Sequence, residues 1–199
     1  MGQVLGELSL QELLDSVGDR TTAPGGGAVA GVVAALAGAL AGMCARFSGD
    51  DQTDLARLAD ELRVRAIELA QADLAVYAAY VRARRAGRDH EVAAALDETI
   101  RVPLEMAEVA AELAELADGL ARSGNPNLRG DANVAVLMGA AAARAGAMLV
   151  CENLVGAGSD PRLVRAAAVV ASVSAAERNV IFLHPALRTV GELPHPNGE

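Results

Sequence analysis

Apolar residues at helical spacing follow one another along this chain, separated by short clusters of Gly, Pro and Asp. Ser9, with a glutamate three residues later, forms a capping box ahead of an amphipathic stretch that ends near Gly18. After Pro24 and residues 25–27, all glycine, only small or aliphatic side chains occur before Arg46. This pattern predicts a short surface helix, a tight glycine turn and then a long apolar helix.

The third predicted helix is long, because no Gly or Pro occurs between Gly49 and Gly87. After several capping acids at residues 50–54 it would run about 35 residues, or about 50 Å. Its buried side has an apolar residue at every seventh position, namely Leu55, Leu62, Leu69 and Val76. Asp73 lies beside this seam. A lone carboxylate there indicates either a structural ion pair or a functional role.

Helical periodicity returns over residues 89–120, with Pro103 inside it. Proline removes one backbone hydrogen bond, so we expect the helix to break or kink there. Beyond it, acidic residues three or four apart predict one outward-facing stripe, made of Glu105, Glu108, Glu112, Glu115 and Asp118.

Two more helices are predicted in the last third of the chain. Residues 123–127 give a strong turn signal, and Asp131 or Asn127 then caps a helix over about residues 132–155. Pro161 opens a sixth helix that ends near residue 183. Three prolines and two glycines in residues 184–199 predict a loosely attached tail.

Together these elements predict one all-α domain over residues 1–199, a bundle of about six helices around the apolar one. Two or three helices are too apolar to be exposed, which favours a homodimer in which the small-residue helices meet. The uncharged stretch 23–45 is also long enough to span a bilayer. Its strongly apolar side chains are few and no basic cluster flanks it, so we expect a buried helix and no membrane partner.

Composition narrows the possible functions. The net charge of −9 makes nucleic acid an unexpected partner. All 17 basic residues are arginine, which excludes a Schiff-base lysine and a Walker-type phosphate loop. Aromatic residues make up only 2% of the chain, so the core consists of Ala, Leu and Val and favours closely packed helices over a sheet.

The cysteines and histidines suggest neither disulfides nor metal. Cys44 and Cys151 lie in apolar helical stretches, as expected for free thiols in a reducing compartment. His90, His184 and His195 are scattered and have no Cys or carboxylate at ligand spacing, so we expect no metal. The N-terminus has neither a basic start nor an apolar core of signal-peptide length, and we expect a cytoplasmic protein.

Five motifs stand in order along the chain. They are LQELL at 10–14 followed by TAPGGGAVA at 22–30, DLAVY at 73–77, Pro103 with Leu104, GNPN at 124–127 with GD at 130–131, and Asn153 with Leu154. In this order and spacing they resemble the cyclodeaminase/cyclohydrolase family. This family includes the cyclodeaminase domain of formiminotransferase-cyclodeaminase and stand-alone methenyltetrahydrofolate cyclohydrolases.

The resemblance implies an all-helical homodimeric enzyme of folate one-carbon metabolism, with a tetrahydrofolate derivative as substrate and no tightly bound cofactor. It implies hydrolysis of 5,10-methenyltetrahydrofolate to 10-formyltetrahydrofolate, which we expect for a short domain without a fused transferase, or cyclisation of formiminotetrahydrofolate with release of ammonia. The first reaction would make the protein a hydrolase and the second a lyase. Both reactions pass between an amidinium-like cation and a tetrahedral adduct. They need a carboxylate to offset positive charge and a base to take a proton.

On this resemblance Asp73 is the electrostatic partner or base, and Asp131 the binder or acid. The backbone N–H groups of Gly25, Gly26 and Gly27, at a helix start, are expected to hold a carbonyl or carboxylate of the substrate. Asn125 and Asn153 are expected to orient the pterin or the bridging carbon. Structural alternatives remain for each residue type: an N-cap for Asp131, a turn residue for Asn125 and helix-end hydrogen bonding for Asn153. The three glycines have one as well, since they can serve only to turn the chain and let helices pack.

One segment departs from the family pattern. Folate enzymes of this family commonly carry a glycine and several basic residues after the apolar helix, suited to an anionic polyglutamate tail. Here residues 48–54 read SGDDQTD, which is acidic. This segment favours a second hypothesis, a non-catalytic helical dimer or binding module on the same scaffold.

Overall fold

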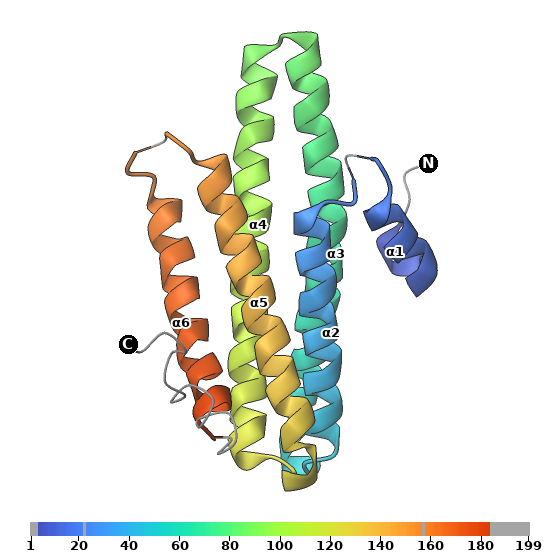
Figure 1. Cartoon of the computed structure of the whole chain (residues 1–199), viewed down its shortest axis with the longest axis vertical. Helices are drawn as coiled ribbons and strands as arrows, with labels where there is room; N and C mark the ends of the chain where they lie inside the picture. The colour runs from blue at the N-terminus through green and yellow to red at the C-terminus, as the bar shows by residue number, and fades with distance from the viewer. Residues whose placement is uncertain (1–3, 22, 157, 184–199) are drawn as a thin grey trace, which may run out of the picture.

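The computed structural model describes residues 4–21, 23–156 and 158–183, and within them the chain is helical with no strand (Figure 1). The α-helices are α1 (Leu10–Gly18), α2 (Gly26–Arg46), α3 (Thr53–Ala86), α4 (Asp89–Ser123), α5 (Arg129–Asn153) and α6 (Pro161–Leu183). Short 3-10 turns precede three of them: η1 (Leu5–Glu7), η2 (Asp50–Gln52) and η3 (Pro126–Leu128). The predicted all-α bundle is confirmed, whereas the predicted tail at 184–199 lies outside the described residues.

The antiparallel hairpin of α3 and α4 is the longest part of the bundle (Figure 1). Helix α2 packs against α3, α4 and α5, and α6 covers α4 and α5. Figure 1 shows α1 at the side of the bundle and the α3–α4 tip extending beyond the start of α2. The apolar helix α2 therefore packs against three others, and one face of it remains exposed at Leu36.

Local sequence signals set several helix ends. Ser9 makes the predicted capping box at α1, because its side chain accepts from the Glu12 amide and the Glu12 carboxylate accepts from the Ser9 amide. Gly87 ends α3 in a left-handed conformation, with φ of 64°. The glycine turn is shorter than predicted, since α2 already begins at Gly26.

The small-residue face of α2 is used inside the chain. A Cβ on Gly31 would lie 2.7 Å from the Cβ of Ala70 on α3, so only glycine allows this approach. On α5, a Cβ on Gly146 would lie 2.8 Å from the carbonyl oxygen of Pro103. These glycine positions therefore let α2 and α5 pack closely against α3 and α4 in the same chain.

Pro103 does not break α4, which is one helix from Asp89 to Ser123. The acidic stripe beyond it also differs from the prediction at one position. Asp118 is buried, pairs with Arg122 one turn later and accepts hydrogen bonds from Asn179 on α6. It is part of the α4–α6 contact and does not face outward.

Two segments of the described chain, α2 and the stretch from η3 through α5, are long and apolar enough to cross a membrane. Of the most apolar part of each, 61% and 50% respectively is buried against other helices. Such burial is expected of core helices and supports the buried-helix reading of α2 over the membrane alternative.

Candidate active site

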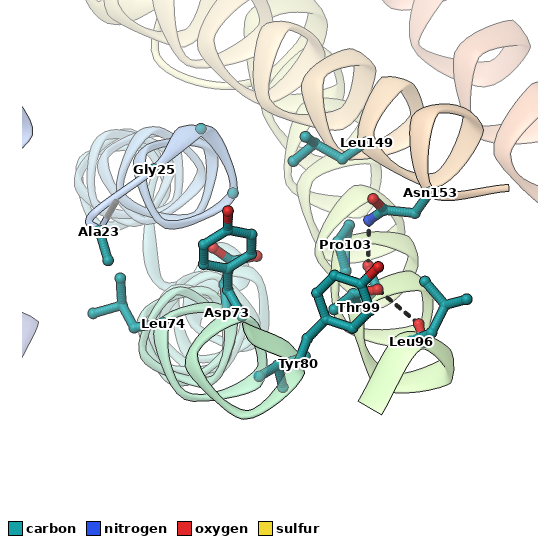
Figure 2. A pocket seen from close by; sticks show the side chains of 14 residues that line it. Ala23, Gly25, Asp73, Leu74, Tyr80, Leu96, Thr99, Pro103, Leu149 and Asn153 are labelled. Carbon is teal, nitrogen blue, oxygen red and sulfur yellow. Dashed lines mark hydrogen bonds between the residues drawn. The ribbon is translucent and has the colours of Figure 1, made fainter. Parts of the chain in front are cut away.

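A pocket of about 260 Å³ lies at the N-terminal end of α2, where α2, α3, α4 and α5 approach one another (Figure 2). Most of its walls are apolar. The residues that line it are Ala23, Gly25, Gly26, Gly27, Asp73, Leu74, Val76, Tyr77, Tyr80, Leu96, Thr99, Pro103, Leu149 and Asn153. Within this described lining, Asp73 is the sole charged residue.

Asp73 projects from α3 toward the first turn of α2 (Figure 2). Gly27 makes this possible, because a Cβ there would lie 2.2 Å from Asp73 Oδ1. The backbone N–H of Ala28 donates a hydrogen bond to the Asp73 carboxylate. Free N–H groups at a helix start favour negative charge, so the positive end of α2 is directed at this side chain.

Burial raises the pKa of Asp73 above its ordinary value of 3.8, and the hydrogen bond from Ala28 offsets this only in part. A carboxylate with a raised pKa is a stronger base than an exposed aspartate, and its conjugate acid still releases a proton readily. Asp73 can therefore both accept and return a proton, and while ionised it can stabilise a nearby cation.

Asn153, the last residue of α5, replaces a backbone hydrogen-bond donor that α4 lacks at Pro103. Pro103 has no N–H, so the Thr99 carbonyl one turn earlier loses its helical partner. Asn153 Nδ2 donates to that oxygen at 2.7 Å (Figure 2). This bond accounts for the continuity of α4 through Pro103. It also fixes the Asn153 amide at the pocket wall.

Sequence reasoning did not assign Tyr77 and Tyr80 to the site, although both line the pocket. They follow Asp73 by four and seven residues, which places all three on one face of α3. The available signal was their rarity, because the chain has only two Tyr, two Phe and no Trp. Thr99 was also missed; its hydroxyl donates to the Leu96 carbonyl at 2.7 Å.

The structure therefore brings together five of the predicted site residues at one pocket: Gly25, Gly26, Gly27, Asp73 and Asn153. The expected role of the glycine N–H groups changes, since one amide of this helix start is taken by the protein's own carboxylate.

Asp131 and Asn125 do not lie at this pocket within one chain. The charge of Asp131 acts on Cys44, near the C-terminal end of α2, whereas Asp73 contacts Gly27 at its start. These two α2 positions are about 26 Å apart at 1.5 Å per residue. Asn125 Nδ2 donates to the Phe47 carbonyl at 2.9 Å, also at that far end.

Two further predicted features have a clear placement. Asp131 is the third residue of α5 and is not its N-cap, while Asn125 caps η3 by accepting from the Asn127 amide. The acidic segment at 50–54 forms η2 and the start of α3, at the end of α2 away from the pocket. None of its residues lines the pocket, so its negative charge is not evidence about which ligand the pocket binds. No group of three metal-ligating side chains occurs in the described part of the chain.

Comparisons with known proteins identify a matching family and a similar solved structure. A sequence model of a family described as formiminotransferase-cyclodeaminase matches residues 9–169, a span that includes every residue lining the pocket. Among solved structures, formiminotetrahydrofolate cyclodeaminase from Thermotoga maritima is similar with a TM-score of 0.81 and 27% sequence identity. That match covers 94% of this chain and 98% of the other. No curated protein matches the sequence.

Proposed function

Since the chain belongs to the formiminotransferase-cyclodeaminase family, we propose that it is a folate one-carbon enzyme that cyclises formiminotetrahydrofolate and releases ammonia. The solved relative is a formiminotetrahydrofolate cyclodeaminase. The hydrolysis of 5,10-methenyltetrahydrofolate that the sequence analysis favoured becomes the alternative. The observation that carries the proposal is the half-buried Asp73 carboxylate, the only charge in the described pocket lining.

The proposed reaction transfers one proton through Asp73. Nitrogen N10 of the substrate attacks the carbon of the protonated formimino group, and a C–N bond forms. Asp73 accepts the N10 proton, which leaves a tetrahedral adduct. It then returns this proton to the former formimino nitrogen, whose C–N bond breaks as ammonia departs. The methenyl bridge remains as a cation, which the ionised Asp73 stabilises.

The apolar walls of the pocket support cyclisation over hydrolysis. Cyclisation needs no water, because the attacking nitrogen belongs to the substrate. Leu74, Leu96 and Leu149 line the pocket and offer water no hydrogen-bond partner. In such surroundings the attraction between a carboxylate and a developing cation is also stronger than in water.

The test is to incubate purified protein with 5-formiminotetrahydrofolate and follow both ammonium and the methenyl chromophore. We expect both products in equal amounts, with a loss of about 100-fold or more in kcat for Asp73→Asn, as for a general base. Glu115→Gln, an exposed carboxylate on α4, is the matched control. Loss of the chromophore of added methenyltetrahydrofolate without ammonium release would favour the cyclohydrolase. No turnover of either substrate would favour the non-catalytic binding module.

Asp131→Asn is informative in the same assay. Asp131 lies far from Asp73 within one chain, so a loss as large as that of Asp73→Asn would mean that a second chain brings Asp131 to the pocket. An effect of only a few fold would leave Asp73 as the principal carboxylate.

We also propose that the chain acts in the cytoplasm as a homodimer that uses the outer face of α2 and α5. Large apolar side chains are exposed there: Leu36, Val134, Leu137 and Met148. Light scattering should give the dimer mass for the wild type and a smaller mass for Leu36→Glu. Val164→Glu, at an exposed apolar residue of α6, serves as control. A monomeric wild type would refute this proposal.

A further inference from the structure

Four chemically different side chains form a line along α3. Asp73, Tyr77, Tyr80 and Arg84 occur at intervals of four, three and four residues, which places them on one helix face. We refer to these four residues as the α3 stripe. From Asp73 to Arg84 it rises about 16 Å toward the α3–α4 tip. Its first three residues line the pocket, and Arg84 lies one turn beyond.

The pocket is too small to enclose an elongated ligand. Its volume of about 260 Å³ is below the range of roughly 300–1,000 Å³ typical of sites that bury a whole small molecule. A tetrahydrofolate has a fused heterocycle, an aryl ring and a carboxylate-bearing tail in series. Only the reacting end can therefore be enclosed, and the remainder must lie along a wall that leads out of the pocket.

The two tyrosines make the α3 wall suited to flat rings. Both tyrosines of the chain are in the stripe, and the Tyr77 side chain is 44% exposed although it lines the pocket. Exposed aromatic rings beside a cavity offer faces on which a planar group can stack. In Figure 2 the Tyr80 ring points from α3 toward the side of Thr99 on α4, away from the start of α2.

Arg84 supplies a cation at the outer end of the stripe. Its guanidinium lies over the Tyr80 ring, 5.9 Å from the centroid, and Nη1 is 3.5 Å from the Tyr80 hydroxyl oxygen. Among the residues that the structure describes, no carboxylate pairs with Arg84, whereas Arg57 on the same helix pairs with Glu61. Arg84 is thus held in place by an aromatic ring while its charge remains available to a carboxylate.

We propose that the α3 stripe is the binding track of the substrate: Tyr77 and Tyr80 stack its planar rings, and Arg84 binds the carboxylates of its tail. This inference rests on the proposed function, because it assumes that the reacting end is at Asp73. It places the anionic tail at the α3–α4 tip, at the opposite end of α3 from the acidic segment 50–54.

The test measures dissociation constants of two non-reacting probes, pteroic acid and pteroyltriglutamate, which share the rings and differ in the anionic tail. The wild type should bind the triglutamate more tightly. Arg84→Gln should reduce that preference about two- to fivefold, the effect of one exposed ion pair. Arg82→Gln is the matched control, because it removes the same charge nine residues after Asp73, on the opposite face of α3.

Tyrosine variants test the ring part of the track. Tyr77→Leu and Tyr80→Leu should each weaken both probes about three- to tenfold, as expected for the loss of one aromatic stack. Tyr80→Phe keeps the ring and should leave the binding of pteroic acid unchanged. Circular dichroism confirms that each variant is folded, and if Tyr80→Leu unfolds, the effect of Tyr77→Leu decides the ring assignment.

Equal effects of Arg84→Gln and Arg82→Gln would overturn the tail assignment, and unchanged binding of pteroic acid by Tyr77→Leu and Tyr80→Leu would overturn the ring assignment. If ammonia release depends on Asp73 while all stripe variants bind as the wild type does, only this inference fails. If the probes bind as described but no substrate is turned over, the α3 stripe remains a ligand-binding track and the proposed function fails. A wild type that binds neither probe refutes the track.

Discussion

The side-chain amide of Asn153 on α5 takes the place of the backbone amide that Pro103 removes from α4. Its Nδ2 lies 2.7 Å from the Thr99 carbonyl oxygen, the group that Pro103 leaves without a helical donor. Because both Asn153 and Pro103 line the pocket, the same hydrogen bond joins two helices and shapes the wall of the candidate active site.

Removal of the Asn153 amide should destabilise the protein. Asn153→Ala leaves the partly buried Thr99 carbonyl unpaired, and we expect a loss of about 1–3 kcal/mol in the free energy of unfolding. In the Pro103→Ala background the Thr99 carbonyl regains a backbone donor, so the same substitution should have a smaller effect. A double-mutant cycle by urea denaturation measures the difference, and equal losses in both backgrounds would refute this coupling.

Gly27 should not tolerate a methyl group. In Gly27→Ala the new Cβ would lie 2.2 Å from Asp73 Oδ1, so the carboxylate must leave its place against α2. We expect a lower melting temperature and a loss of Asp73-dependent activity. Gly26→Ala is the stability control, because no atom lies within 4 Å of its added Cβ, and it should keep or slightly raise the melting temperature. Equal melting temperatures for the two variants would contradict the contact.

The raised pKa of Asp73 predicts how stability depends on pH. Between the ordinary value of 3.8 and the raised value, the folded chain keeps a proton that the unfolded chain has released. Raising the pH through this interval therefore lowers the free energy of unfolding. Asp73→Asn has no such proton to lose. The free energy of unfolding of this variant minus that of the wild type should therefore rise from about pH 4 upward and then level off. If this difference instead falls with rising pH, the pKa of Asp73 is lowered in the folded chain and the prediction is wrong.

The raised pKa of Asp73 also predicts how activity falls at low pH. The proposed reaction begins with an ionised Asp73, so kcat/KM should fall on the acid side with a midpoint above 3.8. The profile is measured with 5-formiminotetrahydrofolate, after correction for its spontaneous cyclisation. An acid limb at or below the ordinary aspartate value would argue against Asp73 as the base.

The two thiols should differ strongly in reactivity. Cys151 is exposed, whereas Cys44 is 2% exposed and its pKa is raised by burial and by the charge of Asp131. A thiol reagent should therefore modify one cysteine rapidly in the native protein and the second only after unfolding. Cys151→Ser should abolish the rapid phase, and a rapid phase that persists in this variant would show that Cys44 is accessible.

Sequence reasoning located the helices well because their ends depend on local signals. Gly49 and Gly87 bound the η2–α3 segment at residues with positive φ, which glycine adopts readily, and Ser9 caps α1 through contacts within four residues. Of the break or kink predicted at Pro103, the break does not occur, for the opposite reason. Its missing hydrogen bond is supplied by Asn153, fifty residues later, and no local pattern contains that information.

The site was predicted in part for a related reason. Asp73 stood out as a lone charge on an apolar side of α3. Tyr80, two turns later, lies on the same helix face, and helical spacing alone would have been enough to place it there. The position of Asp131 depends instead on the length of α4, which carries the chain the whole length of the bundle before α5 begins. Asp118 was misplaced because its partner Asn179 comes from α6.

The start of α2 contributes only backbone to the pocket, since Gly25, Gly26 and Gly27 have no side chains. A protein engineer who wishes to enlarge the cavity can remove nothing there, and any addition at Gly27 displaces the reactive carboxylate. Changes in substrate range must therefore arise from the facing helices, through positions such as Tyr80 and Leu96, while one side of the cavity stays constant.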